Sequence, residues 1–348
     1  MPSSGSGSAR LPAPRTRWHV RWPSCSASTT PGRPDRPERP SRARSAAVVT
    51  RLRIGTRRSR LALAQAGEVA ARLAAFGVET ELLPMTTSGD RGASPDRSPF
   101  GLKGLFVDAI EDALRSGRID LAVHSAKDLP SEDPPGLTVA AVPERSDPFD
   151  VLVTREPWLR DGGVVGTSSL RRRAQFLRSR PGVRVEELRG NVDTRLRRLN
   201  EGALDGVLLA AAGLARLGVR PANARPLPIE DMVPAPGQGA LAIQTRADDD
   251  ATLAILARLE HARSRAAFDA ERRLTSLLGG GCALPLGAYA EQRDEGTRLL
   301  AVVVRPDGED LVWAQAEAGT PEEVAGQVAE TLRRGGADAI LAAVRGEA

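Results

Sequence analysis

Residues 164–173 read Val-Val-Gly-Thr-Ser-Ser-Leu-Arg-Arg-Arg: an apolar strand, a Gly-Thr pair, two serines and the start of an arginine-rich helical pattern. The same order occurs about a hundred residues earlier, where a strand over 51–56 ends in Gly-Thr and Ser59 opens a helical pattern. Two such units predict two copies of one α/β domain type. A hydroxyl-rich helix N-terminus presents free N–H groups to a carboxylate or a phosphate. Serine is also an ordinary N-cap, so either unit alone leaves both interpretations open, whereas the occurrence of two such units favours anion binding.

Further helices and strands follow from the hydrophobic spacing. The first helix ends at Gly77, and its expected apolar face consists of Leu61, Ala64, Val69, Leu73 and Phe76. A second helix is expected over 103–116, a strand over 119–123 and a return crossing between domains at 234–243. Beyond residue 262 the pattern changes to that of a small α+β domain. Its expected elements are a helix over 266–278, strands over 298–304 and 309–316, and a helix opened by the capping box Thr320-Pro321-Glu322-Glu323.

The positive charge of the chain is concentrated in its first fifty residues. The 348-residue chain has a net charge of +5, but residues 1–50 hold nine arginines against Asp35 and Glu38, a net of +7, so the rest carries −2. With only 3% aromatic residues to stack on bases, the folded part does not fit a nucleic-acid binder. The proline-rich extension is predicted to be disordered; a start codon assigned too early and a targeting segment are the alternatives. No uncharged apolar run approaches the ~18 residues of a membrane span.

These patterns divide the chain into four predicted parts. They are a disordered basic extension (1–50), a first α/β domain (51–146 plus 241–261), a second α/β domain (147–240) and an α+β domain (262–348).

The strand expected over 119–123 runs into His124-Ser125-Ala126-Lys127-Asp128. A Lys-Asp pair after a buried strand lies at the edge where open α/β sheets bind ligands, and a surface ion pair is the alternative. Lys127 and Lys103 are the only lysines among 49 cationic residues. Because lysine and arginine are not interchangeable, both positions are candidates for a compact ammonium. His124 is interpreted as structural.

Arginines gather at turns and strand ends in the middle of the chain. Their planar forks bind carboxylates bidentately, so several forks on one cleft would hold a small poly-carboxylate. The candidates are Arg171, Arg172, Arg189 and Arg195, whereas Arg178, Arg180 and Arg198 are expected on a solvated helix face.

The two cysteines are Cys25 in the extension and Cys282 in the folded part. A single core cysteine forms no internal disulfide and no zinc site, so a reducing compartment and no metal are expected. Cys282 is either a packing residue or a reactive thiol.

Four motifs in this order resemble those of the porphobilinogen deaminase (hydroxymethylbilane synthase) family. They are Gly280-Gly281-Cys282-x-x-Pro-x-Gly287, His124-Ser-x-Lys-Asp-x-Pro130, Gly166-Thr-Ser-Ser-Leu-Arg-Arg172 and Arg189-Gly-Asn191. The resemblance runs from about Leu52 to the C-terminus. It implies a fold of two periplasmic-binding-protein-like (type II) α/β domains around a cleft, plus a small α+β C-terminal domain.

The resemblance also implies the reaction. A dipyrromethane cofactor attached to Cys282 would serve as primer for the head-to-tail condensation of four porphobilinogens, with loss of ammonia and hydrolytic release of hydroxymethylbilane. The enzyme would be a cytoplasmic monomer of tetrapyrrole and haem biosynthesis, with no nucleic-acid or membrane partner. A non-catalytic anion-binding module of the same shape is the alternative, although such a module has no use for the thiol of Cys282.

The resemblance assigns roles to individual residues. Asp128 is the catalytic carboxylate. The expected cofactor-binding residues are Cys282, Lys127, Ser125, Thr167, Ser168, Ser169, Arg171, Arg172 and Gly190. The expected substrate-binding residues are Arg57, Ser59, Lys103, Phe106, Arg189, Arg195 and Arg216. The chain departs from the family pattern at Ser98-Pro99-Phe100, where a lysine is common, and at Leu102, where glycine is usual. These departures concern the mobility and charge of a loop near the cleft.

Overall fold

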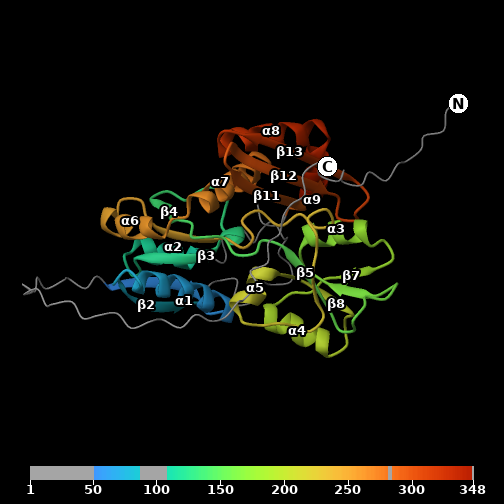
Figure 1. Ribbon diagram of the computed structural model, residues 1–348, viewed down its shortest axis with the longest axis horizontal. Coiled ribbons are helices and arrows are strands. Elements are labelled where there is room, and N and C mark those ends of the chain that lie inside the picture. The colour runs from blue at the N-terminus through green and yellow to red at the C-terminus, as the bar shows by residue number, and fades with distance from the viewer. Residues whose placement is uncertain (1–50, 87–107, 281–283, 347–348) are drawn as a thin grey trace, which may run out of the picture. The chain divides into compact units, whose positions relative to one another are not determined.

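The computed structural model describes residues 51–86, 108–280 and 284–346 (Figure 1). By its contacts the chain divides into Met1–Val49 and Thr50–Ala348, and the described residues all belong to the second unit. The predicted disorder of residues 1–50, the loop departures at 98–102, and the site candidates Lys103, Phe106 and Cys282 lie outside the described residues.

The first sheet has five strands in the order β2-β1-β3-β10-β4. Its strands are β1 (Arg51–Arg57), β2 (Glu79–Met85), β3 (Leu121–Ser125), β4 (Leu137–Ala141) and β10 (Leu241–Arg246). The accompanying helices are α1 (Arg60–Ala74), α2 (Asp108–Arg115) and α6 (Asp250–Leu256). Alternate residues of β3 pack on opposite faces, because Leu121 and Val123 join the core under α1 whereas Ala122 joins the core under α2. We call these elements lobe 1.

The second sheet repeats this design with the order β7-β6-β8-β5-β9. Its strands are β5 (Asp150–Thr154), β6 (Val164–Gly166), β7 (Arg184–Glu186), β8 (Gly206–Ala210) and β9 (Ala224–Pro226). Its helices are α3 (Leu170–Ser179), α4 (Val192–Asn200) and α5 (Ala211–Arg216). In each sheet the fourth strand, β10 or β5, is antiparallel to its neighbours. The predicted duplication is therefore confirmed, and we call these elements lobe 2.

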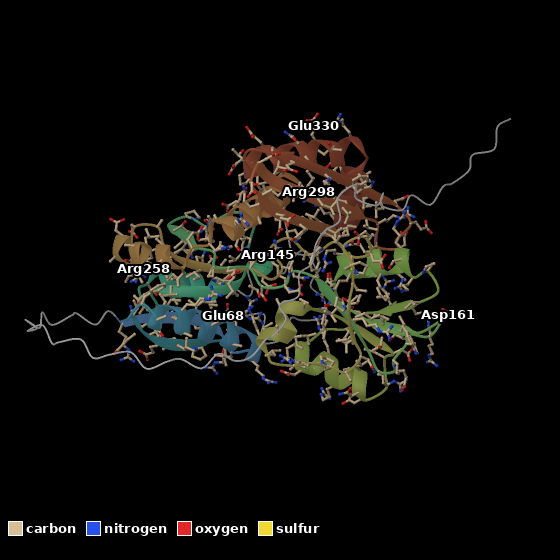
Figure 2. The ribbon with its side chains drawn as sticks, viewed as in Figure 1. Glu68, Arg145, Asp161, Arg258, Arg298 and Glu330 are labelled. Atoms are coloured by element: carbon tan, nitrogen blue, oxygen red, sulfur yellow. The ribbon has the colours of Figure 1, made fainter. Side chains whose placement is uncertain are left out.

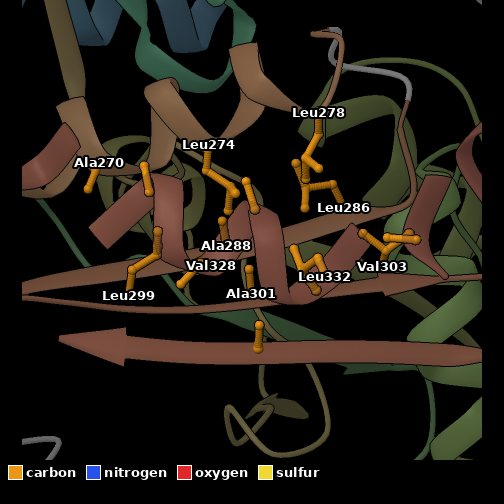
Figure 3. Packing of buried hydrophobic residues seen from close by; sticks show 14 of the residues in the cluster. Ala270, Leu274, Leu278, Leu286, Ala288, Leu299, Ala301, Val303, Val328 and Leu332 are labelled. Atoms are coloured by element: carbon orange, nitrogen blue, oxygen red, sulfur yellow. The ribbon is translucent and has the colours of Figure 1, made fainter. Parts of the chain in front are cut away.

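The third sheet is an antiparallel meander of β11 (Leu286–Arg293), β12 (Gly296–Val304) and β13 (Leu311–Ala318). The helices α7 (Ala262–Leu277), α8 (Pro321–Arg334) and α9 (Ala337–Arg345) accompany it. Figure 3 shows their shared core, in which Leu274 of α7 and Val328 of α8 face Ala288 and Ala301 of the sheet. Every residue of β12 is buried. We call these elements lobe 3, and the expected α/β fold class with a separate α+β unit is confirmed. The domain boundaries themselves stay a prediction.

Two segments cross between lobes 1 and 2, and a buried carboxylate of lobe 3 binds both. Arg145, labelled in Figure 2, is on the crossing between β4 and β5. It forms an ion pair with Glu271 of α7 at 2.7 Å. The second crossing, between β9 and β10, donates the N–H of Gly237 to Glu271 at 2.6 Å. Glu271 also accepts the N–H of Ala290 on β11 at 2.7 Å. The two crossings are therefore held against lobe 3 by one side chain.

The structure corrects three details of the sequence analysis. Helix α1 ends at Ala74, so Phe76 lies in the following turn, 40% exposed, with the Arg258 guanidinium 4.1 Å from its ring centre. The strand expected over 119–123 is β3, which runs two residues further and includes buried His124. Arg178 is not on a purely solvated face, because it donates to the carbonyls of Gly308 and Glu309 in the β12–β13 turn.

The remaining helices and strands agree in kind with the expectations, although α7 begins at Ala262, four residues before the expected start at 266. None of the helices in the described ranges is long and apolar enough to cross a membrane.

Candidate active site

A pocket lies where lobe 1, lobe 2 and lobe 3 meet. It encloses about 630 Å³, including space open to solvent. Lys127 and Ser131 come from the segment after β3, Ser169 and Arg171 from the start of α3, and Phe268 from α7. The remaining lining residues are Ala126, Leu129, Ala235, Pro236, Gly237, Arg272, Thr275, Leu284 and Leu286. Polar donors and apolar walls are thus combined in one site, as in pockets that bind small organic ligands.

The Lys127-Asp128 pair is in a 3₁₀ turn (Ala126–Asp128) directly after β3, as the sequence predicted. Lys127 is half-buried and its Nζ lies 3.5 Å from Oε1 of Gln238. Burial, reinforced by the nearby charge of Arg172, lowers the pKa of Lys127 to about 8. Asp128 is exposed at the same turn. The pair therefore places a partly desolvated ammonium in the wall of the pocket, next in sequence to an exposed carboxylate.

Arg171 and Arg172 are buried on either side of one carboxylate. Asp150, the first residue of β5, accepts from Nη1 of Arg171 at 2.7 Å and from Nε of Arg172 at 2.9 Å. Burial alone would raise the pKa of Asp150, but the two guanidiniums outweigh it and hold the pKa well below its usual range. Gln238 completes the cluster, since its Nε2 donates to Asp150 at 3.1 Å. Two buried cations face one buried anion, so the cluster carries an excess positive charge beside the pocket.

One donor of this cluster has no partner among the residues that the structure describes. The Nε of Arg171 is buried and makes no hydrogen bond there, while Nη1 of the same side chain is bound to Asp150 and to the carbonyl of Val233. A buried donor without a partner is costly and indicates a place for a ligand acceptor. Because Arg171 and Lys127 both line the pocket, the site fits an anionic group.

Ser59 and Ser169, at the two serine-rich helix starts, are both N-caps. Their capping role does not exclude anion binding at the same helix ends. Ser59 accepts the N–H of Ala62 at 3.2 Å and Ser169 accepts the N–H of Arg172 at 3.4 Å. Buried Thr167 accepts the N–H of Ser169 at 3.2 Å. Of these capping residues Ser169 lines the pocket. Capping thus accounts for the serines, and only the α3 start is shown beside a pocket.

Other predicted site residues lie around the start of α4. Arg195 donates to the carbonyl of Gly190 at 2.8 Å and lies 3.5 Å from Oγ of exposed Ser168. Burial and the charge of Arg172 lower the pKa of Arg195 to about 10. Gly190 has φ +116, and a Cβ there would lie 2.9 Å from Cγ2 of Thr194. Arg189 is exposed and forms a surface ion pair with Glu187 at 2.6 Å.

Of three further candidates, one connects lobes 1 and 2 and two belong to lobe 1. Arg216 of α5 binds Glu68 of α1 at 3.0 Å and the carbonyl of Gly239 at 3.1 Å, with 8% of its side chain exposed. Ser125 pairs with Gln65 of α1 at 2.7 Å. Arg57 is the last residue of β1 and is half-buried. None of the three lines the pocket.

His124 is a buried residue of β3. Burial lowers its pKa to about 4, although a hydrogen bond with Gln244 acts in the opposite direction. No group of three or more metal-ligating side chains occurs within the described ranges.

Sequence reasoning missed several residues of the site. Asp150 and Gln238 are the partners of the arginine cluster, and Ser131, Phe268 and Arg272 line the pocket. Asp150 is the first residue of an apolar strand, and a carboxylate that is buried there needs a cationic partner. This position in the sequence could have indicated that Asp150 pairs with an arginine. The lining residues of α7 carried no comparable signal.

The fold and the pocket define a class: an α/β protein with two sheets of like order and a cationic, partly apolar pocket where both lobes meet a third. Two family models match the chain. The model described as "Porphobilinogen deaminase, dipyromethane cofactor binding domain" matches residues 52–254, and "Porphobilinogen deaminase, C-terminal domain" matches residues 266–334. The chain belongs to the porphobilinogen deaminase family.

Curated relatives agree with this assignment. Porphobilinogen deaminase of Brevibacillus brevis is 46% identical over 300 residues, covering 84% of this chain and 97% of that protein. The protein of the same name from Rubrobacter xylanophilus is 45% identical, with 85% and 98% covered. The expected family, enzyme class and dipyrromethane cofactor are confirmed by these matches. The solved methionine binding protein MetQ matches with a TM-score of 0.39 and 15% identity, over 60% of this chain and 89% of that chain, and this weak likeness supports no conclusion.

Proposed function

We propose that the chain is a transferase that joins four porphobilinogen molecules head to tail on a dipyrromethane bound to Cys282, with loss of ammonia, and releases hydroxymethylbilane by hydrolysis. One observation carries the proposal: the cationic pocket is lined by Leu284, two residues after Cys282 in the chain. The closeness of the two residues in sequence supports Cys282 as the attachment point of the cofactor.

The donors of the pocket fit the cofactor. When bound, the dipyrromethane supplies the pyrrole carbon to which the first substrate is joined. Its acetate and propionate groups need cationic partners, and we assign these to Lys127, Arg171 and Arg172. The buried Nε of Arg171 without a partner among the described residues supports this assignment. Thr167, Ser168, Ser169, Ser125 and Gly190 would add hydroxyl and backbone donors.

Asp128 is proposed as the catalytic carboxylate. Loss of ammonia from porphobilinogen leaves an electron-poor pyrrole, and a carboxylate that accepts from its N–H stabilises the developing positive charge. Asp128 is exposed in the turn between the lining residues Lys127 and Leu129, which leaves it available to a substrate. Lys127, one residue before it, lines the pocket itself, so the turn presents a cation for substrate carboxylates next to the anion for the pyrrole N–H.

The carboxylates of the incoming substrates are assigned to Arg57, Ser59, Arg189, Arg195 and Arg216, with Lys103 and Phe106 assigned from the family resemblance. The partial burial of Arg195 next to Ser168 supports its role. Arg216 would have to leave Glu68 to bind a substrate. We further propose that the enzyme acts as a monomer in the cytoplasm, where a single core cysteine stays reduced.

Intact-mass measurement of the purified protein tests the function. The wild-type protein is expected to carry the added mass of two pyrrole units, and the Cys282→Ser variant none. Asp128→Ala is expected to keep the fold and the attached mass while turnover of porphobilinogen falls by about 10²–10³. A folded wild-type protein with an unmodified Cys282, from a host that makes haem, would favour a non-catalytic anion-binding module instead.

A further inference from the structure

Helix α7 leads directly to the segment that contains Cys282. It ends at Leu277, and Gly279 (φ +87) and Gly280 (φ +60) form the turn that follows. The N–H of Gly279 donates to the carbonyl of Ser276 at 3.0 Å, and that of Gly280 to Thr275 at 2.8 Å. The carbonyls of Leu277 and Leu278 are thereby left outside the helix's own hydrogen bonding, as at any helix C-terminus.

Two arginines from other helices bind these carbonyls. Arg333, near the end of α8, donates from Nη2 to the carbonyl of Leu277 at 2.5 Å. Arg345, the last residue of α9, donates from Nη2 to the carbonyl of Leu278 at 2.6 Å. A cation at a helix C-terminus also interacts favourably with the helix dipole. The end of α7 is therefore held by side chains that are 56 and 67 residues away in sequence.

The glycine turn fits between Arg345 on one side and lobe 1 on the other. A Cβ at Gly279 would lie 2.4 Å from Nη2 of Arg345, so glycine provides the space for the guanidinium. A Cβ at Gly280 would lie 2.8 Å from Oγ of Ser131, which lines the pocket three residues after Asp128. Arg272 of α7 also donates to the carbonyl of Pro130 at 3.1 Å. The turn thus connects the segment containing Asp128 with Arg345.

We propose that Arg345 is a positioning residue for the transferase reaction. Through the carbonyl of Leu278 it fixes the Gly279-Gly280 turn against Ser131, and so sets the point from which the chain runs on to Cys282 relative to Asp128. The inference rests on the proposed function, since it assumes that the reacting pyrroles are tethered to Cys282. Displacements of about 1 Å cost up to 10²-fold in rate in well-ordered active sites. The C-terminal helix, remote in sequence from every motif of the site, would thereby contribute to turnover.

The test compares Arg345→Ala and Arg345→Lys with Arg334→Ala, a matched control on an exposed arginine of α8. Each holoenzyme is examined by intact mass, by kcat and KM for porphobilinogen, and by thermal unfolding. For Arg345→Ala we expect the attached mass to be present, kcat to fall on the order of tenfold and KM to stay within twofold of wild type. Arg345→Lys, which keeps one donor, should recover part of kcat. Arg334→Ala should match wild type.

Gly279→Ala brings a Cβ against the same guanidinium and also strains the backbone, which has φ +87. Because only the first of these effects depends on Arg345, the double variant Gly279→Ala/Arg345→Ala should lose less than the product of the two single effects. The proposal is overturned if kcat of folded Arg345→Ala holoenzyme stays within twofold of wild type, or if Arg334→Ala lowers kcat equally. If Arg345→Ala does not fold, a kcat of folded Arg345→Lys holoenzyme equal to that of wild type overturns it. Absence of attached pyrroles from the wild-type protein would instead refute the proposed function.

Discussion

Replacement of Asp150 by asparagine should destabilise the protein more than any surface charge replacement. Asp150 has no exposed surface and is the common partner of Arg171 and Arg172 at 2.7 Å each. An asparagine would keep the size of the side chain and remove its charge, so two buried guanidiniums would face each other without a carboxylate. Breaking a buried ion pair by removing one partner costs about 3–5 kcal/mol. Since Asp150 serves two cations, we expect a loss in free energy of unfolding at the upper end of this range.

The matched control is Asp193→Asn. Asp193 pairs with Arg60 at 2.9 Å, but 42% of the aspartate and 62% of the arginine side chain are exposed. Such a pair is worth about 0–1 kcal/mol. In a chain of this size each kcal/mol shifts the melting temperature by about 2 °C. Asp150→Asn should therefore lower it by about 8–10 °C and Asp193→Asn by about 2 °C or less.

Urea denaturation followed by circular dichroism, together with thermal unfolding, measures both variants. Because the pKa of Asp150 is lower in the folded than in the unfolded protein, its contribution is complete above about pH 4 and is lost only in stronger acid. The difference between the variants should therefore be constant from about pH 5 to 6, below the range in which Lys127 titrates, since the charge of Asp150 helps to hold the pKa of Lys127 up. If Asp150→Asn costs no more than Asp193→Asn at pH 7, the buried cluster does not depend on this carboxylate and the reasoning is wrong.

Two further predictions concern Lys127 and the crossings between the lobes. Because burial lowers the pKa of Lys127 to about 8, the folded protein binds fewer protons than the unfolded chain above that pH. Lys127 should therefore raise the melting temperature of the pyrrole-free Cys282→Ser protein as the pH increases from about 7.5 to 9.5. Lys127→Met should remove that contribution, and an identical pH profile of the melting temperature with and without Lys127→Met would contradict the prediction. The measurements stay below about pH 10 because burial raises the pKa of Tyr289 to about 12, so that Tyr289 adds its own pH dependence above that pH. Gly239→Ala should lower the free energy of unfolding in urea more than Gly218→Ala does. Both glycines have positive φ, but a Cβ at Gly239 would lie 2.5 Å from the carbonyl oxygen of Ser146, whereas a Cβ at Gly218 would contact nothing within 4 Å. Equal losses, each about 1–2 kcal/mol from the left-handed backbone alone, would show that the crossing adapts.

The sequence predicted the site's elements because they are local. Gly-Thr-Ser before a helix specifies an N-cap, and Ser59 and Ser169 are N-caps in the structure. The Lys127-Asp128 pair follows a buried strand, and the position of Lys127 in the pocket wall agrees with the rule that open α/β sheets bind ligands where their strands end. Local patterns of this kind need no knowledge of the tertiary arrangement.

What could not be predicted depends on contacts between distant segments. The pairing of Asp150 with Arg171 and Arg172 requires α3 to pack on the sheet in one register, and the contact of Glu271 with both crossings requires all three lobes. The spacing of Phe76 is helical and predicts a place on a helix face, but Gly77 (φ +77) turns the chain back and the N–H of Val78 donates to the carbonyl of Leu73. The assignment of roles to Arg189 and Arg216 stays a prediction.

The contact of Arg178 with the β12–β13 turn has a consequence for protein engineering. Hairpin turns are normally the places where a chain accepts inserted residues and tags most readily. Here a Cβ at Gly308 would lie 2.9 Å from the carbonyl of Ala174 and 3.0 Å from the backbone nitrogen of Arg178, so the turn is closed by α3. An epitope or fluorophore tag inserted there would separate lobe 3 from lobe 2. Gly326 of α8, where an added Cβ would contact nothing within 4 Å, is the better place for a labelling cysteine on lobe 3.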